Sequence, residues 1–207
     1  MIKNFIFDID RTLIDSYKPE LETLKQALFI VTNNSYSDEI MNQLTVLTTE
    51  EFFFKLGIDT KSDTMKMINR HWDRLLKERK LKFFDGVREL LVELKNKNYF
   101  LAIATSRTMS ELEELDNLMD IIDLFDAVVT SDLVRRPKPD PESINVIIDK
   151  FNLKREETIY IGDSKSDQKA SRNANVYFGF ANWENQNIIE DYDFIFKTPQ
   201  SIYKIAK

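Results

Sequence analysis

Short, mostly apolar runs alternate with amphipathic stretches along much of the chain. Residues 5–7 are apolar at every position, which is typical of a central parallel strand that is buried on both faces. Further runs of this kind follow at residues 99–104, 125–129, 158–161, 176–178 and 194–196. Stretches with apolar residues at helical spacing lie between most of them. Strands that alternate with helices predict an α/β fold, a doubly wound and Rossmann-like parallel sheet.

Residues 17–83 interrupt this alternation after the first strand. Apolar residues recur there at helical spacing, Ser37 and Thr48 precede helical stretches as N-caps, and Gly57 suits a helix end. No strand pattern returns until about residue 99. We therefore predict an all-helical insert that forms a cap domain, and a core domain made of residues 1–16 and 84–207.

Composition narrows the class of protein. With 207 residues, 43% hydrophobic and 31% charged, the chain is long enough for one domain and a modest insert. A net charge of −6 does not suggest a nucleic-acid or anionic-membrane partner, and the lack of cysteine excludes disulfides and thiol chemistry. No apolar run reaches the length of a membrane span, and Met1–Asn4 leads into a strand rather than a signal peptide. We expect a cytoplasmic protein, and its oligomeric state, a monomer included, stays open.

Polar side chains follow several predicted strands or lie in the loop before a helix. They are Asp8 and Asp10, Thr105 and Ser106, Lys138, and Asp163 and Asp167. The carboxyl ends of neighbouring parallel strands share one crevice, so these groups are expected to meet. Clustered carboxylates need a cation, and oxygen ligands suit Mg²⁺. A lysine and a hydroxyl can hold phosphate oxygens, and an aspartate can form an aspartyl-phosphate. The set predicts metal-assisted phosphoryl transfer.

Four motifs in a fixed order support this chemistry. They are Asp8-Ile9-Asp10-Arg11-Thr12, Thr105, Lys138, and Gly162-Asp163-Ser164-Lys165-Ser166-Asp167. In these motifs the chain resembles the haloacid dehalogenase superfamily, in the branch with a helical cap after the first strand. Members of the phosphoglycolate-phosphatase and β-phosphoglucomutase types belong to this branch. The resemblance covers essentially the whole chain, and the cap is its least specific part.

The resemblance implies roles for both aspartates of the first motif. Asp8 would be the nucleophile and a Mg²⁺ ligand. Asp10 would protonate the leaving alcohol and then activate water, while its backbone carbonyl binds the metal. Dehalogenases and phosphonate-cleaving members lack an acid at the position of Asp10, so its presence favours phosphate esters.

The other motifs imply the remaining contacts. Thr105, with Ser106 beside it, and Lys138 would hold the phosphate, and Asp163 would bind the metal directly. Asp167 would support the metal or its waters, and capping of the helix after Ser164 is its alternative role.

Two positions depart from the pattern of the superfamily. Arg11 stands where glycine is usual. Its side chain either adds a contact at the phosphate site or points to solvent. Asn175 stands where relatives commonly have glycine, and asparagine tolerates left-handed backbone geometry. Neither departure removes a catalytic group.

These observations predict a Mg²⁺-dependent phosphatase that acts on a small phosphorylated metabolite through an aspartyl-phosphate. A phosphomutase of the β-phosphoglucomutase type is the alternative among enzymes. A catalytically silent phosphate-binding regulatory protein is the alternative from another class, and the complete set of acids argues against it.

Substrate selection is expected to fall on the helical insert, because the core supplies only phosphate and metal contacts. The loop at residues 32–36 is polar, and in capped relatives the comparable loop reaches the active site. Its candidate residues are Thr32, Asn33, Asn34 and Tyr36. A plain surface turn is an equal alternative. The Phe52–Phe54 run is the next candidate, although at least two of its rings are expected in the core of the insert.

Overall fold

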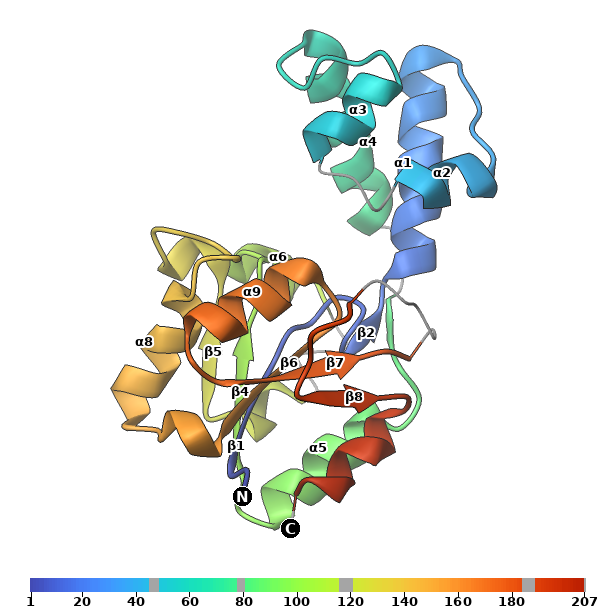
Figure 1. Cartoon of the computed structure of the whole chain (residues 1–207). Coiled ribbons are helices and arrows are strands. Elements are labelled where there is room, and N and C mark those ends of the chain that lie inside the picture. Colours follow the sequence, from blue (N-terminus) through green and yellow to red (C-terminus); the bar gives the residue numbers. More distant parts are fainter. Residues whose placement is uncertain (45–48, 78–80, 116–120, 184–188, 207) are drawn as a thin grey trace. The chain divides into compact units, whose positions relative to one another are not determined.

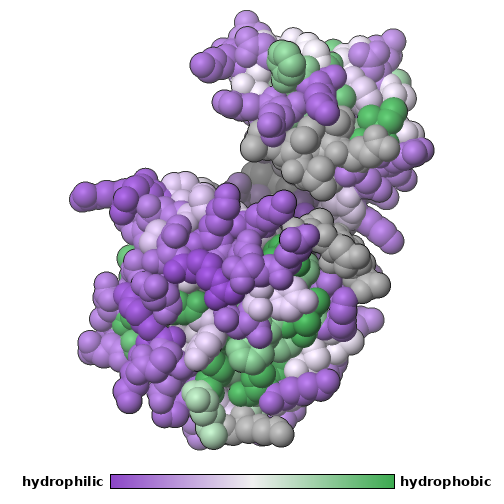
Figure 2. Space-filling view, in the orientation of Figure 1, coloured by the Kyte–Doolittle hydropathy of each residue, from purple (hydrophilic) through white to green (hydrophobic). Residues whose placement is uncertain are grey.

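The chain forms two compact units in a computed structural model that describes residues 1–44, 49–77, 81–115, 121–183 and 189–206 (Figure 1). The α/β unit consists of Met1–Asp15 and Leu81–Lys207, and the helical unit consists of Ser16–Lys80. None of the described helices is long and apolar enough to cross a membrane. On the visible face, hydrophilic residues cover most of the surface of both units (Figure 2).

A six-stranded parallel sheet forms the centre of the α/β unit. Its strands are β1 (Asn4–Phe7), β4 (Phe100–Ala104), β5 (Ala127–Val129), β6 (Thr158–Gly162), β7 (Tyr177–Ala181) and β8 (Phe194–Phe196). Their order in the sheet is β5-β4-β1-β6-β7-β8, so β1 lies between β4 and β6. Phe7 pairs with Ile103 on one side and with Ile161 on the other, which brings the carboxyl ends of all three strands together. The predicted doubly wound fold is confirmed.

Helices cover both faces of this sheet. Phe5 and Phe7 of β1 pack in the cluster that includes α5 (Val87–Asn96) and a 3₁₀ segment at Pro199–Lys204. Ile6, between them, packs in the opposite cluster with residues of α8 (Glu142–Phe151) and α9 (Lys165–Asn173). Successive strand residues point to opposite faces, which explains why β1 needs an unbroken apolar run. Burial of each such side chain contributes about 1.5–3 kcal/mol.

One short strand contradicts the expectation of no strand between residues 16 and 99, and its partner strand lies just before this stretch. β2 (Ile14–Asp15) pairs antiparallel with β3 (Lys82–Phe83) where the chain leaves and re-enters the α/β unit. Strands of two residues are too short to show an alternating pattern in the sequence. Helix α6 (Met109–Glu113), between β4 and β5 in the chain, is also short.

The helical unit contains α1 (Tyr17–Thr32), α2 (Asp38–Leu44), α3 (Thr49–Lys55) and α4 (Asp63–Lys77). Ser37 accepts a hydrogen bond from the N–H of Ile40, so its predicted capping role is observed, while Thr48 lies outside the described residues. Phe52 and Phe53 are buried, with ring centroids 5.0 Å apart, and Phe54 is 81% exposed. Two of the three rings therefore belong to the core of this unit.

Short 3₁₀ segments complete the described elements of the α/β unit. They are Ile122–Leu124, Ser131–Leu133, Arg155–Glu157 and Pro199–Lys204. The left-handed backbone expected at Asn175 is present, with φ of 54°.

Candidate active site

Asp8 and Asp10 lie in the turn that follows the central strand β1. The Asp8 N–H donates to the carbonyl of Ile161 at 2.9 Å, which extends the pairing with β6 by one residue. The chain then turns sharply, and Arg11, with φ of 58°, donates its N–H to the carbonyl of Ile14 at 2.8 Å. Asp8 is buried and Asp10 is partly buried. The turn thus delivers both carboxylates to the carboxyl edge of the sheet.

Lys138 connects three groups from different elements. Its Nζ atom lies 2.7 Å from Oδ1 of Asp8, 2.7 Å from Oδ1 of Asp167 and 3.0 Å from the hydroxyl of Tyr160. An ammonium group has three donors, so these contacts use all of them. Burial lowers the pKa of Lys138, but the charges of Asp167 and Asp8 raise it well above its usual value. Lys138 is therefore a permanent positive charge in this site.

Asp167 is held by the start of helix α9. Ser164 donates its N–H and its hydroxyl to Oδ2 of Asp167, at 3.0 and 2.5 Å, and accepts the N–H of Asp167 at 3.1 Å. This reciprocal capping box satisfies donors at the helix N-terminus. Lys138 binds the other carboxylate oxygen of Asp167, and Tyr160 lies 3.1 Å from it. Asp167 therefore caps the helix and orients Lys138 at the same time.

Three carboxylates come together where the strands end. One oxygen from each of Asp8, Asp163 and Asp167 lies within 4.8 Å of the others. Burial raises the pKa of Asp8 to about 7, although Lys138 acts against this. Burial likewise raises the pKa of Asp163 well above its usual value, against the positive charge of Arg11, whose Nε lies 3.2 Å away. Buried anions that crowd each other in this way fit a divalent cation with oxygen ligands.

Asp10 is paired with a residue that sequence reasoning missed. Arg107 donates to both oxygens of Asp10, at 2.7 Å from Nε and 2.6 Å from Nη2. Arg107 lies two residues after Thr105 at the end of β4, and its N–H donates to the Thr105 hydroxyl at 3.2 Å. Thr105 is buried, whereas Ser106 is exposed. Its place directly after Thr105 and Ser106, at the end of a predicted strand, is a sequence signal that Arg107 lies near the site, but it does not identify Asp10 as the partner.

The second residue missed by sequence reasoning is Tyr160. It is fully buried in β6, and its hydroxyl donates to the carbonyl of Ala104 at 2.8 Å besides contacting Lys138 and Asp167. Burial raises the pKa of this phenol well above its usual value, so it stays neutral. A polar tyrosine tip within an otherwise apolar strand is a signal for such a buried contact.

This arrangement can be compared with known proteins. The model of the haloacid dehalogenase-like hydrolase family matches residues 5–181. The chain belongs to this family. The predicted superfamily and the prediction of a hydrolytic enzyme are thereby confirmed.

Three similar proteins illustrate the range of the family. A phosphorylated carbohydrates phosphatase from Thermotoga maritima is 31% identical over 82% of this chain and 74% of its own length. The pyrophosphatase PpaX of Bacillus mycoides is 26% identical over 88% of this chain and 84% of its own length. A solved structure from Lactobacillus plantarum, assigned as a phosphoglycolate phosphatase, has a TM-score of 0.85 and 22% identity over 99% of both chains. It shares the fold.

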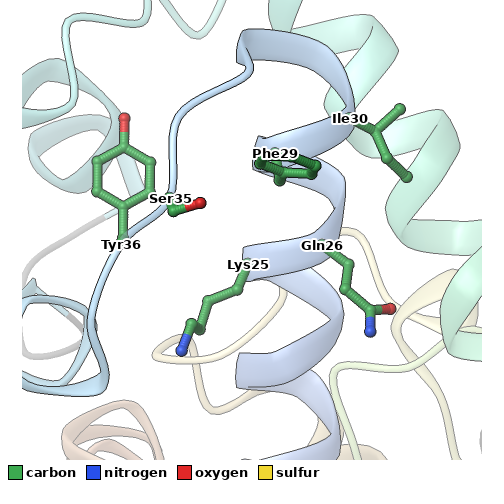
Figure 3. A pocket seen from close by; sticks show the side chains of 6 residues that line it. All are labelled: Lys25, Gln26, Phe29, Ile30, Ser35 and Tyr36. Atoms are coloured by element: carbon green, nitrogen blue, oxygen red, sulfur yellow. The ribbon is translucent and has the colours of Figure 1, made fainter.

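The helical unit has a pocket of its own. It has a volume of about 280 Å³ and is lined by residues of α1 and of the loop after it (Figure 3). The lining residues are Lys25, Gln26, Phe29, Ile30, Ser35 and Tyr36. Within the predicted selector loop, Thr32 donates its hydroxyl to the Leu28 carbonyl, and Asn33 ends the helix in a left-handed conformation. Of the four candidate residues of that loop, Tyr36 is the one among the lining residues of this pocket.

Proposed function

We propose that this hydrolase is a Mg²⁺-dependent phosphatase that acts on a small phosphorylated metabolite through an aspartyl-phosphate. The observation that carries the proposal is the buried Asp8 carboxylate, held by Lys138 and adjacent to two further carboxylates. The names of the curated relatives support phosphate chemistry, since they are a phosphorylated carbohydrates phosphatase and a pyrophosphatase. A cytoplasmic location remains our expectation.

The residues present fit a magnesium ion. Asp8, Asp163 and the backbone carbonyl of Asp10 would hold it, since they offer the hard oxygen ligands that Mg²⁺ prefers. Asp167 already receives hydrogen bonds on both oxygens from Lys138 and Ser164, so we assign it to support of the site rather than to direct ligation. When bound, the metal would neutralise charge on the phosphate.

The protein groups account for the two chemical steps. A carboxylate oxygen of Asp8 attacks phosphorus, the bond from phosphorus to the leaving oxygen breaks, and Asp10 gives its proton to that oxygen. Asp10 then takes a proton from water, the water oxygen attacks phosphorus, and cleavage of the acyl-phosphate linkage releases phosphate and restores Asp8. Thr105 and Ser106 would hold the phosphate oxygens together with Lys138, which would exchange one of its three present contacts for the phosphate and whose positive charge favours the anion.

The helical unit is proposed to act as a cap that recognises the rest of the substrate. The α/β unit supplies groups suited to phosphate and metal, and these groups are common to every phosphate ester. Discrimination between esters therefore needs other side chains. The pocket between α1 and its following loop offers an aromatic ring, a hydroxyl and an ammonium group, a mixture that suits a polar organic ligand.

The test is a screen of phosphorylated metabolites with the full chain in Mg²⁺, followed by the best substrate with Asp8→Asn. We expect release of inorganic phosphate, its loss in excess chelator and inhibition by Ca²⁺, which prefers more ligands and looser geometry. Asp8→Asn keeps the size of the side chain but removes the nucleophile, so kcat should fall by at least about 10³-fold.

Circular dichroism and the melting temperature of Asp8→Asn check that the variant is folded. Near-normal turnover by this variant, or full activity in chelator, would overturn the covalent metal-dependent mechanism. Conversion of a sugar phosphate to its isomer without phosphate release would instead identify a phosphomutase. No turnover of any phosphate ester would leave a silent phosphate-binding protein as the better description.

A further inference from the structure

Arg11 adopts a backbone conformation that is unfavourable for a residue with a side chain. Its φ of 58° lies in the left-handed region, where a Cβ atom crowds the following carbonyl oxygen and glycine is favoured. The turn is closed by the backbone hydrogen bond from Arg11 to Ile14, which glycine could also make. The turn therefore does not require the arginine side chain. Any function of this side chain has to come from the contacts of its guanidinium group.

The guanidinium of Arg11 lies against Asp163. Its Nε atom is 3.2 Å from Oδ2 of Asp163, and the two side chains are only 26% and 11% exposed. Because the pair is largely withdrawn from water, its charges are weakly screened. Arg11 thus places a positive charge directly against a buried carboxylate.

Asp163 is also a member of the acidic trio. Lys138 binds the other two members, Asp8 and Asp167, at 2.7 Å each, while Arg11 contacts Asp163. A divalent cation and the guanidinium would therefore draw on the same carboxylate. Two positive charges that share one carboxylate repel each other, and the repulsion is strong where water is excluded.

We propose that Arg11 competes with the divalent cation for Asp163 and thereby weakens the binding of Mg²⁺ by this enzyme. The inference rests on the metal site of the proposed function. The competition is reciprocal by thermodynamic linkage. The stabilisation that the Arg11–Asp163 ion pair gives to the metal-free site is therefore lost when the metal binds. With an uncharged residue at position 11, the same carboxylates bind Mg²⁺ more tightly.

The experiment measures the dissociation constant of Mg²⁺ by isothermal titration calorimetry on the metal-free full chain, without substrate. Arg11→Gln keeps much of the side chain and removes its charge, and Arg11→Gly also suits the left-handed φ. Both should bind Mg²⁺ about tenfold more tightly, within the range by which neighbours of metal ligands change affinity. Arg11→Lys keeps the charge and should bind Mg²⁺ much as the unchanged protein does.

Two controls separate this effect from general changes in charge or folding. Lys66→Gln removes a positive charge that is 73% exposed and paired with Asp63 in the helical unit, so the Mg²⁺ affinity should not change. Asp163→Asn removes the carboxylate for which Arg11 and the metal compete, so Mg²⁺ binding should be severely weakened. The melting temperature of each metal-free variant verifies folding.

The outcomes distinguish this inference from the proposed function. An unchanged or weaker Mg²⁺ affinity in both Arg11→Gln and Arg11→Gly overturns the inference, and weaker binding would mean that Arg11 orients Asp163 for the metal. If these same variants still hydrolyse phosphate esters, the proposed phosphatase function stands even though the inference about Arg11 is rejected. Tighter binding without turnover of any ester by the unchanged protein supports the competition and rejects the phosphatase. Absence of Mg²⁺ binding in every protein overturns both.

Discussion

Asp10 is fixed by the guanidinium of Arg107, which donates to both of its oxygens. A bidentate pair of this kind defines the plane of the carboxylate as well as its position. A general acid has to be oriented toward the leaving oxygen, and it has to carry a proton when the bond breaks. Arg107 therefore holds the Asp10 carboxylate in one orientation, as the proposed role of Asp10 as general acid and base requires.

Asp10→Asn should impair hydrolysis of an alkyl phosphate more than that of an aryl phosphate. An aryl oxide leaves without much protonation, so the first step depends less on the acid, whereas the loss for an alkyl ester should be on the order of 10²–10⁴-fold. Rates of phosphate release from the two esters provide the measurement, and Arg107→Lys should show the same pattern in weaker form. Equal losses for the two esters would assign Asp10 to metal binding or structure instead.

Single residues were predictable where their chemistry is local to a motif. The motifs identified Asp8 and Asp163 at strand ends and Lys138 in the loop before the next helix as neighbours, and the structure brings their charged groups together. The pairing of Arg107 with Asp10 joins residues 97 positions apart and depends on the register of β4 against β1. No pattern within either segment contains that register, so sequence alone could not supply the partner.

The turn from β6 into α9 shows how an element constrains the site. A Cβ atom at Gly162 would lie 2.6 Å from Cγ and 2.7 Å from Oδ2 of Asp167, much closer than real contacts allow. Glycine at this position therefore lets the Asp167 carboxylate fold back over the strand end to reach Lys138 and Ser164. The capping box then locks the carboxylate there.

Gly162→Ala should displace Asp167 and with it Lys138. We expect a lower melting temperature and a fall in kcat/KM on the order of 10²-fold, the effect of misplacing a catalytic group by about 1 Å. Gly179→Ala is the matched control, because its Cβ would meet the Phe196 ring at 2.7 Å, outside the acidic trio. That variant should lose stability while its folded fraction keeps kcat/KM. Similar losses of kcat/KM in both folded variants would contradict the role given to Asp167.

Elements were predictable in proportion to their length. The strands of the main sheet lie in apolar runs of at least three residues, and helices such as α5 and α8, with ten residues each, are long enough to show a helical period. β2 and β3 have two residues each, and their pairing is decided by the return of the chain from the helical unit rather than by local pattern. The same limit applies to α6, which spans only Met109–Glu113 and is stabilised by the capping box of Thr108 and Glu111.

At the scale of the whole molecule, the fold and the family follow from the α/β unit, whose motifs lie on its most regular strands. The helical unit has a separate core that includes Leu28, Met41, Phe52 and Ile68. Its helices were predictable from apolar spacing, but the residues that would carry its proposed role in substrate recognition were not, because a small helical core constrains which residues are buried and leaves the exposed ones free to vary. That proposed role is tested by substitutions on the surface of this unit.

Tyr36→Ala should lower kcat/KM for the best metabolite found in the screen while sparing a generic aryl phosphate. Tyr36 lines the pocket of the helical unit, and an aryl phosphate is expected to need only the phosphate and metal groups of the α/β unit. A loss of about 10–10²-fold for the metabolite alone is expected if the ring and hydroxyl contact its polar part. Tyr36→Phe separates the contribution of the hydroxyl from that of the ring. If kcat/KM also falls in this variant, the hydroxyl is required.

Phe54→Ala is the comparison for this last prediction, because Phe54 is an exposed aromatic residue on another helix of the same unit. It should leave both substrates unaffected. Selective loss with Phe54→Ala rather than Tyr36→Ala would move the selecting surface from the loop after α1 to α3. An equal response of both substrates to Tyr36→Ala would mean that the residue acts on folding or on the phosphate site itself, and would remove the loop as the determinant of specificity.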